Sequence, residues 1–120
     1  MFSEFAKKAI KQDSRNRFES YNNDLSFVPA VMRDFYKNHN PADVEVKMDD
    51  NYFRFIPADK LEITQKLYAL GKECFVFASC NDEPIYLKDN RVYSCLFGKT
   101  GIIEEVLSDS LKEFLDKVQE

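Results

Sequence analysis

Apolar and polar positions along this chain recur with two periods, one typical of helices and one typical of strands. Near the start, Phe2, Phe5 and Ile10 recur at helical spacing, which predicts an amphipathic helix through about Lys11. Its other side is basic, so the helix either packs on the rest of the domain, which we favour, or lies on a membrane. Residues 16–26 are polar and predict a loop or an extension of this helix.

Two further helices are predicted in the first half of the chain, each opened by a proline. Pro29 stands at the first position of one helix, where its missing N–H costs nothing, and Asn40-Pro41 ends that helix. His39 lies at this end, where a helix C-terminus favours a protonated imidazole, so we interpret it as a capping residue. Pro57 opens the other helix, and Gly71 closes it as a C-terminal glycine.

The remaining segments have the patterns of strands. Residues 74–78 lack any charge, and such continuity predicts a strand that is covered on both faces at the centre of a sheet. Alternating segments on either side of it predict two hairpins, the first with an acidic turn and the second with a turn at Asp89-Asn90. The hairpins comprise residues 44–48 with 52–56, and 84–88 with 91–96.

The C-terminal part adds a turn, a strand and a helix. The turn is Gly98-Lys99-Thr100-Gly101, whose G-K-T lacks the earlier glycine of a phosphate-binding loop. Residues 102–106 predict a last strand, and Ser108 is expected to cap a final helix. Its core positions are Leu111, Phe114, Leu115 and Val118. Together these elements predict an α+β fold with a mixed, mainly antiparallel sheet of about five or six strands and helices packed on it.

Length and composition favour one globular domain. The chain has 120 residues, 44% of them hydrophobic, and we expect a single domain with an N-terminal helix and loop (1–26) and a core (27–120). No apolar run is long enough to cross a bilayer, and no signal-peptide core follows Met1. The three cysteines form no C-x-x-C pair, which favours reduced thiols. These features predict a cytoplasmic protein.

The net charge of −4 is unevenly distributed. Residues 1–17 hold five basic and two acidic side chains, a net of +3, so the rest of the chain carries −7. An acidic body disfavours nucleic acid as a direct partner and favours a basic protein.

The motifs of the sequence predict no catalytic, cofactor-binding or metal-binding residues. The oxygen-rich segments 49–51 and 81–83 lack the spacing of a calcium loop and have the composition of solvated turns. A Cys80–His39 pair would allow a nucleophilic enzyme, but lone thiols beside apolar strands are usually core residues. The six tyrosines either build a binding surface or border the core, and both interpretations remain open.

Three segments of the chain resemble the SUKH superfamily. They are the proline-opened helix 28–41, the strand, turn and strand of 75–87, and the closing helix 107–115. The superfamily includes fungal cell-wall synthesis regulators of the Smi/Knr type and many bacterial immunity proteins. The resemblance implies an α+β domain without enzyme activity or cofactor, and it implies an antidote that binds and blocks a toxin domain.

The hypothesis from the sequence is therefore an immunity protein that neutralises a polymorphic toxin by direct binding. We expect a basic toxin domain, because many such toxins are basic nucleases. The alternative is a regulatory scaffold that binds signalling or cell-wall-synthesis proteins without inhibiting them. We expect no membrane partner, and the oligomeric state stays open. The predicted partner-binding residues are Asp49, Asp50, Tyr52, Asp82, Glu83 and Tyr86.

Overall fold

The computed structural model describes residues 1–98 and 101–119 of an α+β fold. The helices in this part are α1 (Phe2–Gln12), α2 (Ala30–His39), α3 (Leu61–Tyr68) and α4 (Leu111–Leu115), with a 3-10 turn, η1 (Ala58–Lys60), before α3. The strands are β1 (Arg17–Glu19), β2 (Asn40–Asp43), β3 (Glu45–Met48), β4 (Asn51–Phe55), β5 (Phe75–Cys80), β6 (Glu83–Lys88), β7 (Arg91–Gly98) and β8 (Gly101–Ser108).

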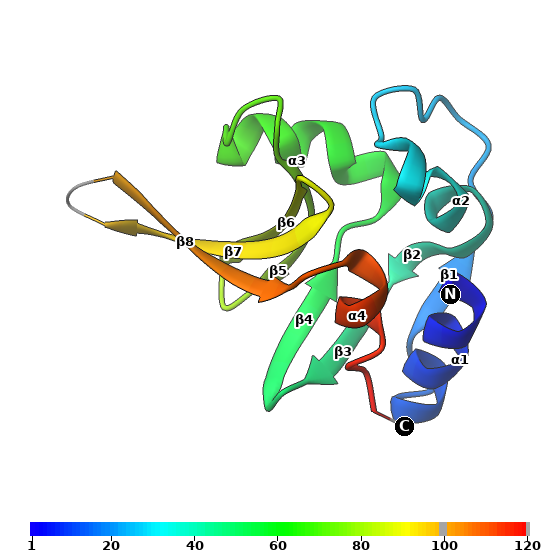
Figure 1. Ribbon diagram of the computed structural model, residues 1–120. Coiled ribbons are helices and arrows are strands. Elements are labelled where there is room, and N and C mark those ends of the chain that lie inside the picture. The colour runs from blue at the N-terminus through cyan, green and yellow to red at the C-terminus, as the bar shows by residue number, and fades with distance from the viewer. Residues whose placement is uncertain (99–100, 120) are drawn as a thin grey trace.

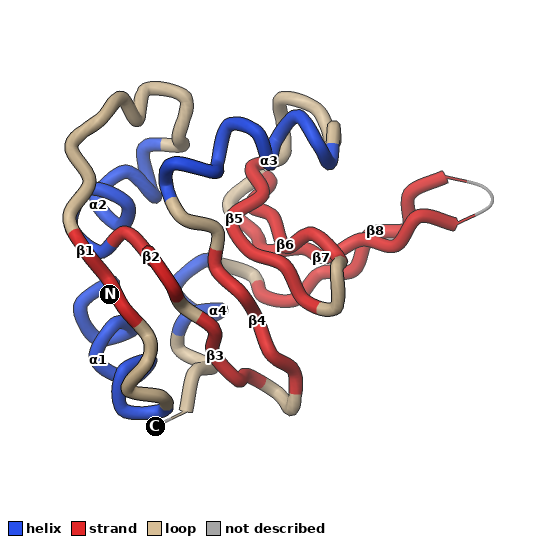
Figure 2. Tube along the Cα trace, turned by 180° about the vertical axis from the view of Figure 1, so that it is seen from behind, coloured by secondary structure: helices blue, strands red, loops and turns tan. Residues whose placement is uncertain are grey.

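The strands form two sheets, shown from opposite sides in Figures 1 and 2. The main sheet has six strands in the order β3-β4-β5-β6-β7-β8, as many as expected, with β5 and β6 at its centre. Every pairing between described strands is antiparallel, so the expectation of a mixed sheet is wrong. The second sheet joins β1 to β2, which corrects the loop predicted for residues 16–26.

Both faces of the central strands are buried, as the uncharged run in β5 predicted. Residues of α1, α2 and α4 cover one face and form the larger apolar cluster with Phe75, Phe77 and Ile85. The smaller cluster, on the other face, consists of Val76, Tyr86 and Cys95, with residues from the end of α3 packed against it. A bulge between Val76 and Ala78 turns both Phe77 and Ala78 toward the larger cluster.

Aromatic rings connect the N-terminal helix to the sheet. Phe5 of α1 lies 5.0 Å from Phe55 of β4, and Phe55 lies 5.9 Å from Phe77, measured between ring centroids. Phe77 in turn contacts Phe114 of α4 at 5.8 Å. Helix α1 therefore packs on the sheet and shares the core of residues 27–120. The radius of gyration, 13.6 Å, is that of a compact chain of this length.

The helix boundaries differ in detail from those expected. Pro29 occupies the position before α2 instead of its first turn. Ala69, not Gly71, adopts the left-handed conformation that ends α3 (φ 51°). Ser110 caps α4 by accepting a hydrogen bond from the Glu113 N–H, whereas Ser108 is buried in β8. In each case the expected residue is of a type found at helix ends, but the helix begins or ends at a position one or two residues away.

Removing the ring of Phe55 tests this shared core. We expect Phe55→Ala to lower the free energy of unfolding by about 3–5 kcal/mol, because Phe55 is fully buried between α1 and the sheet. Val31→Ala, which truncates an exposed side chain on α2, should change it by less than about 0.5 kcal/mol. Urea unfolding measures both, and equal losses in the two variants would contradict this packing.

Candidate partner-binding surface

Three of the turns that join strands of the main sheet fall at the same end of it. Because each strand runs antiparallel to the next, the β3–β4, β5–β6 and β7–β8 turns alternate with the connections at the opposite end. The twist of the sheet fans out the strand ends, and Figure 1 shows the β5–β6 turn between the β3–β4 turn and the projecting strands β7 and β8. The acidic end of the sheet is defined here by Asp49, Asp50, Tyr52, Asp82 and Glu83.

The backbone of the two acidic turns is left-handed at two successive residues. Asp49 and Asp50 have φ of 48° and 66°, and Asn81 and Asp82 have φ of 51° and 66°. Such angles belong to two-residue hairpin turns, in which Asp and Asn are among the best-tolerated side chains after glycine. The turns therefore select aspartates and hold them, exposed, on a rigid scaffold.

One of these aspartates is paired with a cation. The Lys117 ammonium lies 3.4 Å from Asp49 Oδ2. Asp50 and Asp82 form no ion pair with any residue that the structure describes. Two carboxylates at this end of the sheet are thus available to a basic group from outside.

Tyr52 is the large aromatic side chain of the acidic end. It is 60% exposed at the start of β4, directly across the ladder from Lys47. Glu83 is half-buried where β6 begins, opposite Cys80. The structure therefore places five of the six predicted residues at one end of the sheet.

The sixth predicted residue, Tyr86, is not on the surface. It is 1% exposed, its ring stacks on Tyr93 at 5.7 Å, and its hydroxyl donates a hydrogen bond to Glu104. Burial and this hydrogen bond raise the pKa of the Tyr86 hydroxyl. The prediction that Tyr86 contacts a partner is wrong, because β6 is covered on both faces and leaves it no outward face.

Glu104 holds the edge strand β8 to β6 across the intervening β7. Besides accepting from Tyr86, its carboxylate accepts a hydrogen bond from Lys88 Nζ at 3.1 Å. The hydrogen bond from Tyr86, followed by the interaction with Lys88, lowers the pKa of Glu104. The sequence did not reveal this cluster, because the register of β8 decides which of its two glutamates faces Tyr86.

Strands β7 and β8 continue beyond the rest of the sheet as a two-stranded arm. Figures 1 and 2 show this arm projecting away from the helices. Leu96 and Ile103 lie directly opposite each other on it, and they are 52% and 57% exposed. The turn predicted at residues 98–101 includes positions 99 and 100, which lie outside the described residues.

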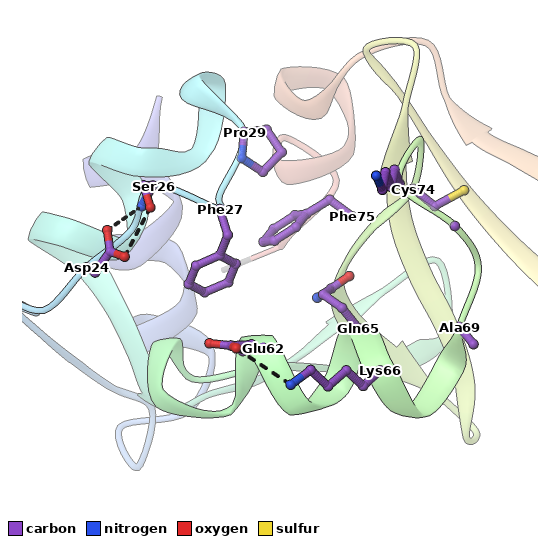
Figure 3. A pocket seen from close by; sticks show the side chains of 12 residues that line it. Asp24, Ser26, Phe27, Pro29, Glu62, Gln65, Lys66, Ala69, Cys74 and Phe75 are labelled. Atoms are coloured by element: carbon purple, nitrogen blue, oxygen red, sulfur yellow. Dashed lines mark hydrogen bonds and ion pairs between the residues drawn. The ribbon is translucent and has the colours of Figure 1, made fainter.

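A groove of about 830 Å³ lies between α3 and the loop that precedes α2. Figure 3 shows the rings of Phe27 and Phe75 lining it, with Glu62 and Lys66 of α3 forming an ion pair of 3.7 Å below them. The side-chain amide of Gln65 pairs instead with the main chain of Val76, which holds α3 against β5. This size and lining suit an apolar or aromatic group.

Among the residues that the structure describes, no three His, Cys, Asp or Glu side chains are placed to hold a metal ion. His39 ends α2 with its Nε2 3.4 Å from Ser3 Oγ. None of the described helices has the length and apolar character needed to span a membrane.

Comparisons with protein-family models, with curated proteins and with solved structures found no significant match to this chain. The geometry of the surface therefore carries the functional argument.

The carboxylate of Glu104 should stabilise the fold in a pH-dependent way. Because its pKa is lower in the folded state, its contribution is present above the ordinary value of 4.5 and is lost as the pH falls through the folded value. We expect Glu104→Gln to cost about 1 kcal/mol at pH 7, since the carboxylate is partly exposed, and less at pH 3.

Glu105→Gln is the matched control, because the neighbouring Glu105 is exposed and faces the other side of β8. Unfolding by urea at both pH values measures the effect. A loss for Glu104→Gln that does not shrink between pH 7 and pH 3 contradicts the role of its charge.

Proposed function

We propose that this chain is a non-enzymatic protein-binding domain that binds a basic protein through the acidic end of its sheet. The observation that carries the proposal is the placement of Asp50 and Asp82, which form no ion pair with a described residue, at the end that also exposes Tyr52. We further propose that the bound protein is a toxin domain and that the chain is its immunity protein.

Charge complementarity supports a basic partner. Residues 18–120 carry a net charge of −7, and the aspartates of the two turns lie on a scaffold that leaves them exposed. Opposed potentials raise association rates by tenfold or more at low ionic strength. A rigid carboxylate also loses little conformational entropy when it pairs with a lysine or arginine.

An exposed tyrosine supplies a second kind of contact. Interface hot spots are enriched in tyrosine, which combines apolar area with a hydroxyl at low entropic cost. Tyr52 is anchored in the β3–β4 hairpin, so it presents its ring without ordering a loop. In this proposal the aspartates guide association, and Tyr52 supplies much of the affinity once the partner has docked.

Occlusion is the proposed mechanism of neutralisation. The carboxylates would occupy basic groups that a nuclease-type toxin uses for its phosphate substrate, so no reaction by the chain itself is needed. The resemblance of three segments to the SUKH superfamily motivates the toxin assignment. The free thiols of Cys74, Cys80 and Cys95 fit a proposed cytoplasmic location.

Replacing the free aspartates tests the proposed surface. Affinity capture from the native cell extract identifies the bound protein, and stopped-flow mixing of the purified pair then gives the association rate. We expect Asp50→Asn with Asp82→Asn to slow association about tenfold at low salt, and the difference should vanish in about 1 M salt. Asparagine tolerates the same left-handed backbone, so the turns are preserved.

The matched control carries Asp89→Asn with Asp34→Asn. Asp89 has the same left-handed backbone (φ 50°) in the β6–β7 turn at the opposite end of the sheet, and Asp34 is exposed on α2. Equal association rates for the two double variants would overturn the placement of the site. A partner whose own activity is unchanged in the complex would identify a scaffold instead of an antidote.

A further inference from the structure

The two outer edges of the main sheet differ in the hydrogen bonds made by their outward-facing backbone N–H and C=O groups. At the β3 edge, Asn16 Oδ1 accepts a hydrogen bond from the Glu45 N–H at 2.9 Å. Gln12 Oε1 accepts from the Lys47 N–H at 2.6 Å, and Gln12 Nε2 donates to the Lys47 carbonyl at 3.0 Å. Side-chain amides from α1 and the loop after it therefore occupy the positions that another strand would take.

The β8 edge has no such cap over most of its length. Lys117 Nζ donates to the Leu107 carbonyl at 2.7 Å, at the base of the strand. For 101–106, no described side chain bonds to the main chain. An antiparallel edge strand directs the N–H and C=O of every second residue away from its neighbour, so this segment can accept a further strand.

Several devices that usually protect an edge strand are missing from the described part of β8, where the charges of Glu104 and Glu105 are the protection present. Residues 101–106 contain no proline, lysine or arginine, and their pairing with β7 runs without a register shift up to Val106. The hydrogen bonds of Glu104 to Tyr86 and Lys88 hold the strand against the sheet. The edge is therefore open, and the bonds of Glu104 fix its position on the sheet, which lowers the entropic cost of adding a strand.

The side chains of β8 indicate what kind of strand fits. On one face, Ile103 (57% exposed) is followed by the exposed Glu105. On the other face, Glu104 is followed by Val106 (47% exposed). Both faces thus present one apolar and one acidic side chain, and the order along the strand is apolar, acidic, acidic, apolar. An added strand that carries apolar, basic, basic and apolar residues in this order complements both faces.

A second copy of the chain is a poor occupant of this edge. Two β8 strands paired about Glu104 and Glu105 would place carboxylates directly opposite each other, and like charges at such positions are destabilising. A basic segment would instead gain an ion pair at the same positions. Charge complementarity therefore favours another protein over self-association.

We propose that the β8 edge binds an extended segment of the partner protein, in which two adjacent basic residues are flanked by apolar residues, as a seventh strand of the main sheet. This inference rests on the proposed protein-binding function and specifies how the partner is held. It is independent of whether that partner is a toxin.

The probe is a capped octapeptide that repeats Val-Lys-Lys-Val twice, called the lysine peptide, added to the isotope-labelled full-length chain. Amide resonances and hydrogen exchange report the contact residue by residue. We expect the β8 amides between Ile103 and Val106 to shift and to gain protection, whereas those of Glu45 and Lys47 on the capped edge stay unchanged. The glutamate peptide, which repeats Val-Glu-Glu-Val twice, should bind about tenfold more weakly.

The Glu105→Lys variant provides the matched test of charge, because Glu105 has no ion pair among the described residues and its replacement leaves the fold intact. It should weaken binding of the lysine peptide and strengthen binding of the glutamate peptide. A lysine peptide that is N-methylated at every residue should not bind, since it keeps the charge but has no N–H group to donate to the β8 carbonyls.

Three results would overturn the inference: β8 amides that do not respond to the lysine peptide, equal binding of both peptides, or concentration-dependent shifts of β8 without peptide. The variant with Asp50→Asn and Asp82→Asn should still bind the lysine peptide through β8. Failure of the aspartate site and failure of the β8 edge are therefore separately observable.

Discussion

The burial of both faces of the central strands is the constraint on which the rest of this structure depends. Strands β5 and β6 pack against α1, α2 and α4 on one face, and against the smaller cluster around Val76 and Tyr86 on the other. Because both faces are covered, the side chains in the middle of β5 and β6 are buried in the core and cannot contact a partner. The surfaces that remain for recognition are the ends of the strands and the outer strands β3, β4 and β8.

This division explains why acidic and aromatic groups gather where they do. The turns at one end need residues that tolerate a left-handed backbone, and aspartate meets that need while adding charge. The sheet is also asymmetric at its sides, since Gln12 and Asn16 close the β3 edge and leave β8 as the open one. Recognition of a basic partner and strand addition are therefore two uses of the same exposed periphery.

Much of the fold was predictable because local patterns and long-range packing agree. The two hairpins, the central strand beginning near Cys74 and the amphipathic α1 follow from periodicity and turn chemistry alone. Strand β1 was missed, since three residues carry no periodicity and its partner β2 contains Pro41, which indicates a break. Ala69 was missed as a helix end because glycine is the usual residue at that position.

The partner-binding residues could be predicted from the sequence only where a local turn or an outer strand by itself makes a side chain exposed. Asp50, Tyr52 and Asp82 are exposed because hairpin turns and the outward face of an outer strand are exposed in almost any fold. Tyr86 was misplaced because alternation shows which residues share a face but not whether that face is covered. Its bond to Glu104 spans two strands, and its register depends on the whole sheet.

Native-state hydrogen exchange of the free chain, resolved residue by residue, tests the central claim most directly. The account predicts that amides of β5 and β6 between Phe75 and Leu87 that lie within the strands exchange only by global unfolding. Alternate amides of β8 between Ile103 and Val106 should exchange orders of magnitude faster. Fast exchange of the β5 amides, or full protection of every β8 amide, would contradict a sheet whose central strands are buried on both faces and whose β8 edge is unpaired.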